Sequence, residues 1–222
     1  MVRLYHLALS PFCRKIRMLL SEKGVEARLI DEKPWERRAD FLALSPGAEI
    51  PVLVTEDGVA ISDSVAIAEY LDEEHPAPPV LPPDIYQRAE ARRLAQWFDV
   101  KFNREVTENL LNERIFKQLR GDGHPDSARI RAGTTNIRLH LEYIDWLADN
   151  RRWLAGDALS IADFAAAAHL SALDYAGDVP WRRASPAKLW YARMKSRPSF
   201  RDLLADRVPG ISPAPHYTDL DF

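Results

Sequence analysis

The sequence predicts two domains, an α/β domain followed by an all-α domain. The first third of the chain alternates short strand-like and helix-like segments, whereas apolar residues recur at helical spacing through most of the remainder. Between these parts, residues 75–83 read HPAPPVLPP, with five prolines in nine residues, and such a segment makes a stiff, extended connector. A length of 222 residues also suits two domains better than one. We therefore expect domains at residues 1–75 and 84–222, joined by a linker at 76–83.

Composition and charge narrow the class of protein. Hydrophobic residues make up 46% of the chain and charged residues 28%, which excludes disordered and disulfide-scaffold classes. The net charge of −3 provides no basic field for a phosphate backbone, so we expect no nucleic-acid partner. The single cysteine, Cys13, and an N-terminus without a long apolar stretch predict a cytoplasmic protein. Because no run approaches about 18 consecutive apolar residues, we expect no membrane insertion.

The first domain is expected to fold in the order βαβαββα. Alternation and turn signals place its strands at residues 2–6, 26–31, 50–54 and 59–62, the last two joined by a Gly-containing hairpin turn. Helical spacing places its helices at residues 12–23 and 41–44, with a third that begins at Asp63 and Ser64. Both of these residue types are favoured as N-terminal helix caps.

The second domain is expected to have a buried central helix and an irregular end. Ser160 and Asp163 form a capping-box pattern, which satisfies the free amides at the start of a helix. The very apolar segment FAAAAHLSAL follows, so this helix is expected to be the centre of the domain. After Pro198 the pattern turns irregular, and residues from about 208 to 222 form an acidic, aromatic tail that we expect on the surface.

Four short motifs occur in a specific order along the chain. SPFCRK follows the first strand, IPVL opens the third strand, SDSVAIAEYLDE begins the third helix, and LSIADF begins the buried helix. In this order and spacing the chain resembles the cytosolic glutathione S-transferase superfamily nearly end to end. The resemblance implies a glutathione S-transferase fold, with a thioredoxin-like first domain that binds glutathione. It also implies that glutathione is a co-substrate and that the helical domain offers an apolar pocket to an electrophile.

The resemblance assigns a glutathione-binding role to four residues. The Ile50-Pro51 bond is expected to be cis, which would turn the backbone of Ile50 toward the cysteinyl part of the ligand. Asp63 and Ser64 would hold the γ-glutamyl end, because a helix N-terminus offers free amides. The alternative is that Asp63 and Ser64 only cap their helix.

Ser10 and Cys13 bracket the turn at the start of the first helix and are the catalytic candidates. Amides at this helix terminus would stabilise a thiolate, and Ser10 would donate a hydrogen bond to the thiolate of glutathione. Cys13 lies one turn later, where packing against the core is the alternative to a redox role. Dithiol exchange within the chain is excluded, because position 10 is not a cysteine. The histidines have no spacing typical of metal ligands, so we expect no metal site.

Two further features favour protein binding. Trp35, in the segment KPWERR, would border the groove that is expected to bind glutathione. There its ring would either contact a binding partner or pack over a helix end. The tail HYTDLDF combines aromatic residues with carboxylates, which suits docking to a partner, although a strap over its own domain is the alternative. Both segments resemble those of the FzlA-type, FtsZ-binding division proteins of alphaproteobacteria. The possible partner-binding residues are therefore Trp35, Tyr217, Asp219, Asp221 and Phe222.

Two functions from different classes follow. The main hypothesis is a glutathione transferase that passes glutathione to a small electrophilic substrate. The alternative is a non-catalytic adaptor that binds FtsZ filaments in bacterial cell division, because a fold does not fix its function. Both imply a homodimer with an isologous contact, as is usual in the superfamily.

Overall fold

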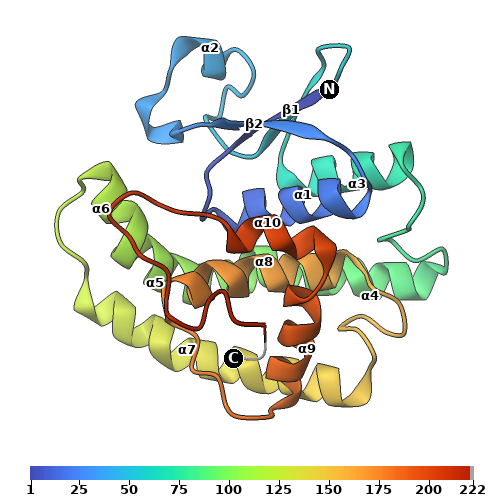
Figure 1. The fold of residues 1–222 in the computed structure, drawn as a ribbon, viewed down its shortest axis with the longest axis vertical. Helices are drawn as coiled ribbons and strands as arrows, with labels where there is room; N and C mark the ends of the chain where they lie inside the picture. Colours follow the sequence, from blue (N-terminus) through green and yellow to red (C-terminus); the bar gives the residue numbers. More distant parts are fainter. Residues whose placement is uncertain (221–222) are drawn as a thin grey trace.

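The computed structural model describes residues 1–220, in which a four-stranded sheet with helices is followed by a bundle of helices (Figure 1). The strands are β1 (Val2–His6), β2 (Ala27–Asp31), β3 (Val52–Val54) and β4 (Ala60–Ser62), in the spatial order β2-β1-β3-β4. β1 is parallel to β2 and antiparallel to β3, and β3 and β4 form the expected hairpin. The predicted fold class, a thioredoxin-like domain in the order βαβαββα plus a helical domain, is confirmed.

Helices cover both faces of the sheet. Because successive strand residues point to opposite sides, the strands contribute core side chains to both faces. Leu4 and Leu53 belong to the core that includes residues of α1 (Pro11–Glu22) and α3 (Ser64–Glu74). On the other face, Phe41 of α2 (Ala39–Leu42) packs with Val52 and Val54. A short 3-10 turn, η1 (Pro34–Glu36), precedes α2. In Figure 1, α2 accordingly lies above the sheet and α1 and α3 lie below it.

The Pro-rich segment after α3 has no regular structure but is held in place. The buried Lys23 donates hydrogen bonds to Asp72, to the carbonyl of His75 and to the carbonyl of Pro78, each 2.6 Å long. The carboxylate of Asp72 in turn accepts from the amides of Val80 and Leu81. Because one lysine and one aspartate satisfy several backbone groups, the connector is fixed against both the first helix and the third.

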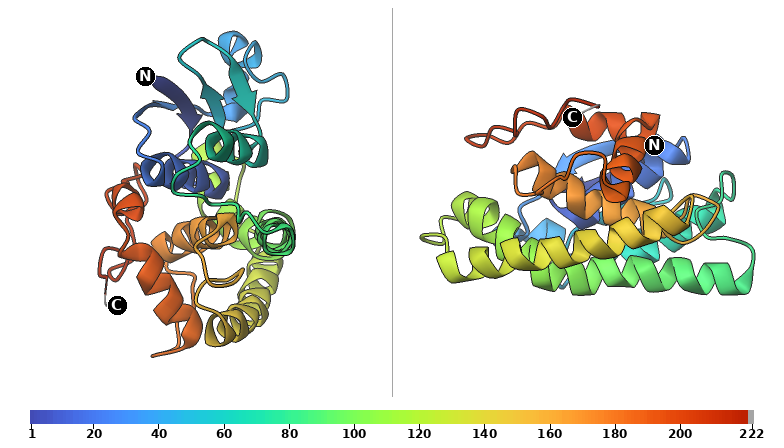
Figure 2. Two further views of the ribbon diagram at one scale, coloured as in Figure 1. Left: turned by 90° about the vertical axis from the view of Figure 1, so that its right-hand side faces the viewer. Right: turned by 90° about the horizontal axis from the view of Figure 1, so that it is seen from below.

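The helical part begins with one continuous rod. It comprises α4 (Ile85–Gln96), η2 (Trp97–Thr107), α5 (Glu108–Leu111), η3 (Asn112–Phe116) and α6 (Lys117–Arg120), of which η2 and η3 have the wider turns of a π-helix. The long helix α7 (Ser127–Asn150) returns beside this rod (Figure 2). α8 (Ile161–Tyr175), α9 (Pro186–Lys195), the turn η4 (Pro198–Phe200) and α10 (Arg201–Leu204) complete the order.

The centre of the helical part is α8, all 15 residues of which are buried. The capping box is present as predicted, with the backbone amide of Ser160 donating to Asp163 at 3.0 Å. Asp163 also accepts from the amide of Leu154 and from the indole of Trp190, each at 2.9 Å. Burial raises the pKa of Asp163, and these donors compensate for taking its carboxyl group out of water.

The contact between the two parts differs from the sequence expectation in one respect. From the sequence alone, Arg14, Lys15 and Arg17 could either attract an anionic peptide or form a charged helix face in water, but all three are buried, because α1 packs against α8 and η4. Each has an acidic partner: Lys15 pairs with Asp99, and both arginines pair with Asp206. The expectation of a solvated face was wrong because the pattern of charges along a helix does not show which charges are paired inside a domain contact.

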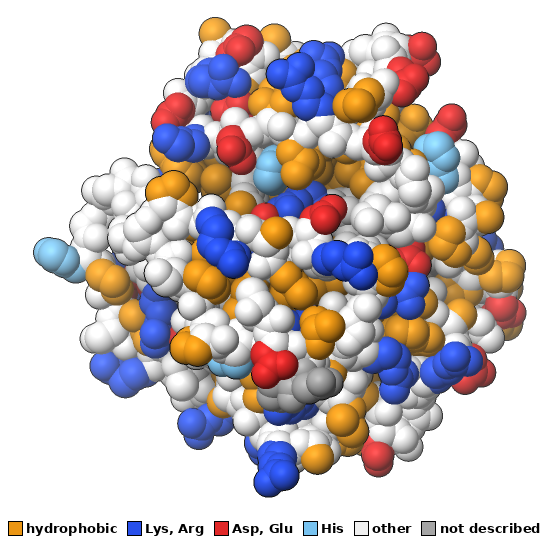
Figure 3. Space-filling model, in the orientation of Figure 1, with side chains coloured by type: hydrophobic (Ala, Val, Ile, Leu, Met, Phe, Trp, Pro, Cys, Tyr) orange, Lys and Arg blue, Asp and Glu red, His pale blue; other side chains and the backbone are white. Residues whose placement is uncertain are grey.

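The face of the molecule seen in Figure 3 has mixed charge. On the face in Figure 3, Lys and Arg side chains alternate with Asp and Glu side chains rather than forming a patch of one sign. Within residues 1–220, no helix is both long enough and apolar enough to cross a membrane.

Candidate functional site

The first element of the site is the turn that begins α1. Ser10 is the N-cap, with extended backbone, and its hydroxyl accepts from the amide of Cys13 at 3.4 Å. The amide of Ser10 donates to the carbonyl of Leu7 at 3.0 Å, and Pro11 occupies the first helical position, where its missing N–H costs nothing. These contacts hold the Ser10 hydroxyl at the positive end of the helix dipole.

Cys13 does not share the position of Ser10. Its side chain has no exposed surface, and it is absent from the wall of the neighbouring cavity. Burial raises the pKa of its thiol to about 11, so the thiol is protonated near neutral pH and is a weak nucleophile. The sequence left open whether Cys13 packs in the core or has a redox role. In the structure Cys13 packs in the core, and this position speaks against a catalytic role.

The second element is the junction of β3, β4 and α3. The Ile50-Pro51 peptide bond is cis, as expected from the resemblance. Asp63 is the N-cap of α3, with a φ of 75°, and its carboxylate accepts from the amides of Val65 at 2.6 Å and Ala66 at 3.2 Å. The predicted capping by Asp63 is thus present, and Ser64 beside it is buried.

These two elements face each other across one cavity. Its volume is about 540 Å³, and its wall includes Ser10, Ile50, Asp63 and Ser64. The fold thus brings four of the predicted site residues together, although they are far apart in sequence. Pro51 is buried at the start of β3 and does not line the cavity.

The same cavity is also lined by residues that were not identified from the sequence, and by Trp35, which was. Trp35, next to α2, is half-buried and lines this cavity. Asp99 and Val100 of η2, Phe116 of η3 and Arg120 of α6 line it from the helical part. A second cavity, of about 450 Å³, lies on the other side of Ser10 and Phe12 and has polar residues such as Asn103 and Thr107 in its wall. The helical side of the groove thus combines apolar with polar side chains, and the apolar acceptor pocket that the resemblance implies stays a prediction.

A buried ionic chain lies beneath the groove. Lys15 of α1 donates to Asp99 of η2, and Asp99 lies 3.6 Å from the imidazole of His169 on α8. The Nδ1 atom of His169 is 2.8 Å from the hydroxyl of Thr107. Burial by itself would raise the pKa of Asp99, but Lys15 and His169 lower it below its usual value, so the carboxylate stays ionised. Because only the folded contact pairs these residues, no sequence spacing could have identified them.

The C-terminal tail is largely attached to its own chain. Tyr217 is fully buried, and its hydroxyl contacts Arg14 and the carbonyl of Leu203. The prediction that Tyr217 offers an anchor to a partner is therefore corrected, because its ring already fills the core and the strap alternative describes it. Asp219 is exposed, as is Leu220, whereas Asp221 and Phe222 lie outside the described residues.

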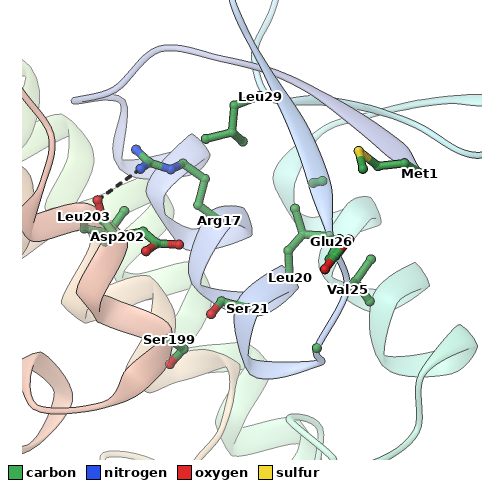
Figure 4. Close-up of a pocket in the computed structure, with 12 residues that line it drawn as sticks. Met1, Arg17, Leu20, Ser21, Val25, Glu26, Leu29, Ser199, Asp202 and Leu203 are labelled. Atoms are coloured by element: carbon green, nitrogen blue, oxygen red, sulfur yellow. Dashed lines mark hydrogen bonds between the residues drawn. The ribbon is translucent and has the colours of Figure 1, made fainter.

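A further groove lies on another side of the first domain (Figure 4). It has a volume of about 480 Å³ and lies between α1, the outer strand β2 and α10. Leu29 of β2 points into it, and Arg17 donates to the carbonyl of Asp202 at its rim. None of the predicted site residues up to Asp219 lines this groove. Within residues 1–220, no group of three or more His, Cys, Asp or Glu side chains could hold a metal ion.

Comparison with known proteins is consistent with this geometry. Residues 9–74 match the family model described as "Glutathione S-transferase, N-terminal domain". The chain is 48% identical over 222 residues to "FtsZ-localized protein A" of Caulobacter vibrioides, covering 99% of this chain and 97% of that protein.

Two solved structures are similar over their whole length. One is a glutathione S-transferase from Rhodospirillum rubrum F11, with 54% identity, a TM-score of 0.98 and complete coverage of both chains. The other is FzlA from C. crescentus, with 47% identity and a TM-score of 0.96, covering 100% of this chain and 99% of that one.

Proposed function

We propose that this chain, which belongs to the glutathione S-transferase family, works as an adaptor that binds FtsZ filaments in bacterial cell division. The observation that carries the proposal is the 48% identity to FtsZ-localized protein A, which extends over the whole chain and not only over the glutathione-binding part of the family. Such a role needs the fold as a platform and does not require turnover. It would take place in the cytoplasm.

The proposed binding surface combines the mouth of the groove with the end of the tail. Trp35 is half-buried at the groove, which leaves part of a large ring available, and aromatic residues are enriched in binding hot spots. Asp219 is exposed in the tail and supplies negative charge. Asp221 and Phe222 lie outside the described residues and stay candidate partner-binding residues from the sequence alone, whereas Tyr217 supports the tail from within.

Co-sedimentation with filaments tests this proposal. FtsZ of Caulobacter vibrioides would be assembled with GTP and centrifuged with the chain. Trp35→Ala and Asp219→Lys are each expected to lower the bound fraction severalfold, as removal of a hot-spot or charged contact does. Leu189→Ala and Asp157→Lys, which change an exposed apolar and an exposed acidic residue elsewhere, are the matched controls. Equal binding by all four variants would contradict the proposed surface.

A second candidate function, glutathione transfer to an electrophile, is favoured by the cavity that Ser10, Ile50, Asp63 and Ser64 share. Ser10 would donate to the thiolate, and the backbone of Ile50 would pair with the cysteinyl part. The γ-glutamyl end carries both an ammonium and a carboxylate. Asp63 would hold the ammonium, because its charge repels a carboxylate, and the hydroxyl of Ser64 would donate to the carboxylate. Catalysis would need only thiolate stabilisation and proximity.

The transferase candidate has its own test. Millimolar glutathione is expected to raise the melting temperature, since a ligand that binds only the folded state stabilises it. Turnover of 1-chloro-2,4-dinitrobenzene, a general electrophile, is expected to fall in Ser10→Ala with little change in melting temperature. Absence of any thermal shift would remove this candidate and leave the adaptor proposal intact.

Both functions include a homodimer as partner. Exposed apolar side chains lie on the first domain at Val59 and Val65 and on the helical domain at Tyr86 and Trp146. A twofold dimer in which the first domain of each copy meets the helical domain of the other would cover both groups. Sedimentation equilibrium tests this, and Trp146→Glu is expected to shift the chain toward monomer.

A further inference from the structure

Arg14 connects four separate segments although its side chain is fully buried. Its Nε donates to the carbonyl of Ala8 at 2.8 Å, and its Nη2 donates to Asp206 at 2.9 Å. Its Nη1 donates to the hydroxyls of Ser171 at 3.0 Å and Tyr217 at 2.8 Å. Because a guanidinium is planar and its donors have fixed directions, these partners fix one orientation of the side chain.

The partner from the tail is itself fully satisfied. The hydroxyl of Tyr217 accepts from Arg14 and donates to the carbonyl of Leu203 at 2.8 Å. Burial raises the pKa of this phenol, so the hydroxyl keeps the proton that it donates. Loss of the hydroxyl would therefore leave one N–H of the buried Arg14 guanidinium without a partner, which is costly, whereas the carbonyl of Leu203 would keep the amide of Asp206 at 3.3 Å.

The tail reaches Tyr217 by a path that other contacts hold. It leaves α10, passes α6 and returns toward α9 (Figure 1). The amide of Ala214 donates to the carbonyl of Tyr175 at 2.8 Å, and the hydroxyl of Tyr175 donates to the carbonyl of Ile211 at 2.8 Å. His216 lies 2.9 Å from the carboxylate of Asp174. The tail is thus attached to the end of α8 independently of Arg14.

We infer that Arg14 and Tyr217 are positioning residues through which the C-terminal tail holds the turn that carries Ser10. Ala8, which accepts from Arg14, lies two residues before Ser10, and Arg14 itself lies in the first turn of the helix that Ser10 caps. The path from the tail to the turn therefore comprises two hydrogen bonds, from Tyr217 to Arg14 and from Arg14 to Ala8. A partner that draws Tyr217 of the tail away from Arg14 would loosen the Ser10 turn, so the two regions of the proposed binding surface would communicate.

The single cysteine provides a direct test in the full chain. Cys13 is buried in the first turn of α1, so a thiol reagent such as iodoacetamide reaches it only when this turn opens. Tyr217→Phe keeps the ring and removes only the hydroxyl. We expect it to raise the labelling rate of Cys13 about tenfold, as loss of a hydrogen bond to a charged group would.

Tyr175→Phe is the matched control. It also removes a buried tyrosine hydroxyl that holds the tail, through Ile211 and Val208, but that hydroxyl makes no contact with Arg14. We expect it to lower global stability by a similar amount while leaving Cys13 labelling within about twofold of wild type. Equal labelling rates for the two variants would overturn the inference.

A double-mutant cycle gives a second test. It measures the coupling between Arg14 and Tyr217 in Cys13 labelling, which two independent structural roles would not produce. Arg14→Lys keeps the positive charge beside Asp206 but cannot reach all four partners. If Tyr217 acts on the turn through Arg14, the double variant should label no faster than Arg14→Lys alone. If the labelling rate of the double variant instead rises by the product of the two single effects, the two residues act independently, and the inference is overturned.

The inference depends on the proposed function only in taking the Ser10 turn as part of the binding surface. Cys13 labelling needs neither FtsZ nor glutathione. If labelling follows the expected order but neither ligand binds, the proposed function fails and the coupling stands. If a ligand binds and labelling does not follow this order, the coupling fails and the function stands.

Discussion

Lys15 of α1 is ion-paired with Asp99 of η2, so that the first helix of the α/β domain is joined to the long helical rod inside a buried contact. Both side chains are nearly inaccessible to water, and Asp99 lines the cavity that Ser10 also lines. The pair therefore supports the floor of the groove from both domains. Because a buried charge without its partner is strongly unfavourable, the pair also makes the two domains depend on each other.

The first prediction concerns this pair. Lys15→Met is expected to lower the free energy of unfolding by about 3–5 kcal/mol, because Asp99 stays buried without its counter-charge. Urea denaturation measures the change. The control is Lys33→Met, which breaks an exposed pair with Glu36 and is expected to cost less than about 1 kcal/mol. Similar losses in both variants would contradict the role given to Lys15.

The second prediction concerns the loss of stability at acidic pH. The pKa of Asp99 is lower in the folded chain than its usual value, so this group stabilises the fold above its unfolded pKa. That contribution is lost as the pH falls through the lower, folded pKa. Asp99→Asn is therefore expected to flatten the dependence of unfolding free energy on pH below about pH 4, near the unfolded pKa. Urea titrations at several acidic pH values measure it, and an unchanged slope would contradict the assignment.

The third prediction concerns His6 at the end of β1. Burial, with a smaller contribution from Arg17, lowers the pKa of His6 from 6.5 to about 4. Below pH 6.5 the unfolded chain therefore takes up a proton before the folded chain does, so His6 destabilises the fold progressively as the pH falls toward 4. The total effect is about 3 kcal/mol. His6→Gln is expected to reduce this loss between pH 6.5 and 4, and an identical pH profile for the variant would contradict the shift.

The fourth prediction concerns the centre of the helical domain. Asp163→Ala removes the acceptor for Ser160, Leu154 and Trp190 together. It is expected to cost about 3 kcal/mol or more, because buried donors are left unpaired. Ser160→Ala removes a single cap and is expected to cost about 1 kcal/mol. Chemical denaturation of the two variants should show this order, and the reverse order would contradict the contact set.

Sequence reasoning succeeded where local chemistry decides the outcome. The Gly-containing hairpin turn and the caps at Asp63 and Ser160 depend on residues close together in the chain, and each lies where the pattern predicted it. Ser10, Ile50, Asp63 and Ser64 were implied by the family resemblance, and the fold places them around one cavity. Whether they bind glutathione stays a prediction.

The rest depended on contacts between distant residues. A solvated helix face was one interpretation of Arg14 and Lys15, because the sequence does not show that they form ion pairs with Asp206 and Asp99. Tyr217 was predicted to anchor a partner because the tail combines aromatic residues with carboxylates, and the sequence could not decide between this role and the strap alternative. Asn103 and Thr107 of η2 line the second cavity, a placement that helical periodicity does not reveal.

The central claim, that the groove mouth and the tail together contact FtsZ, is tested most directly by hydrogen–deuterium exchange of the chain with and without GTP-assembled filaments. The proposal predicts protection on filament addition in two segments, residues 34–38 around Trp35 and residues 216–220 around Asp219. Exchange in α9 should be unchanged. Protection confined to other surfaces, or no protection at a large excess of filaments, would contradict it.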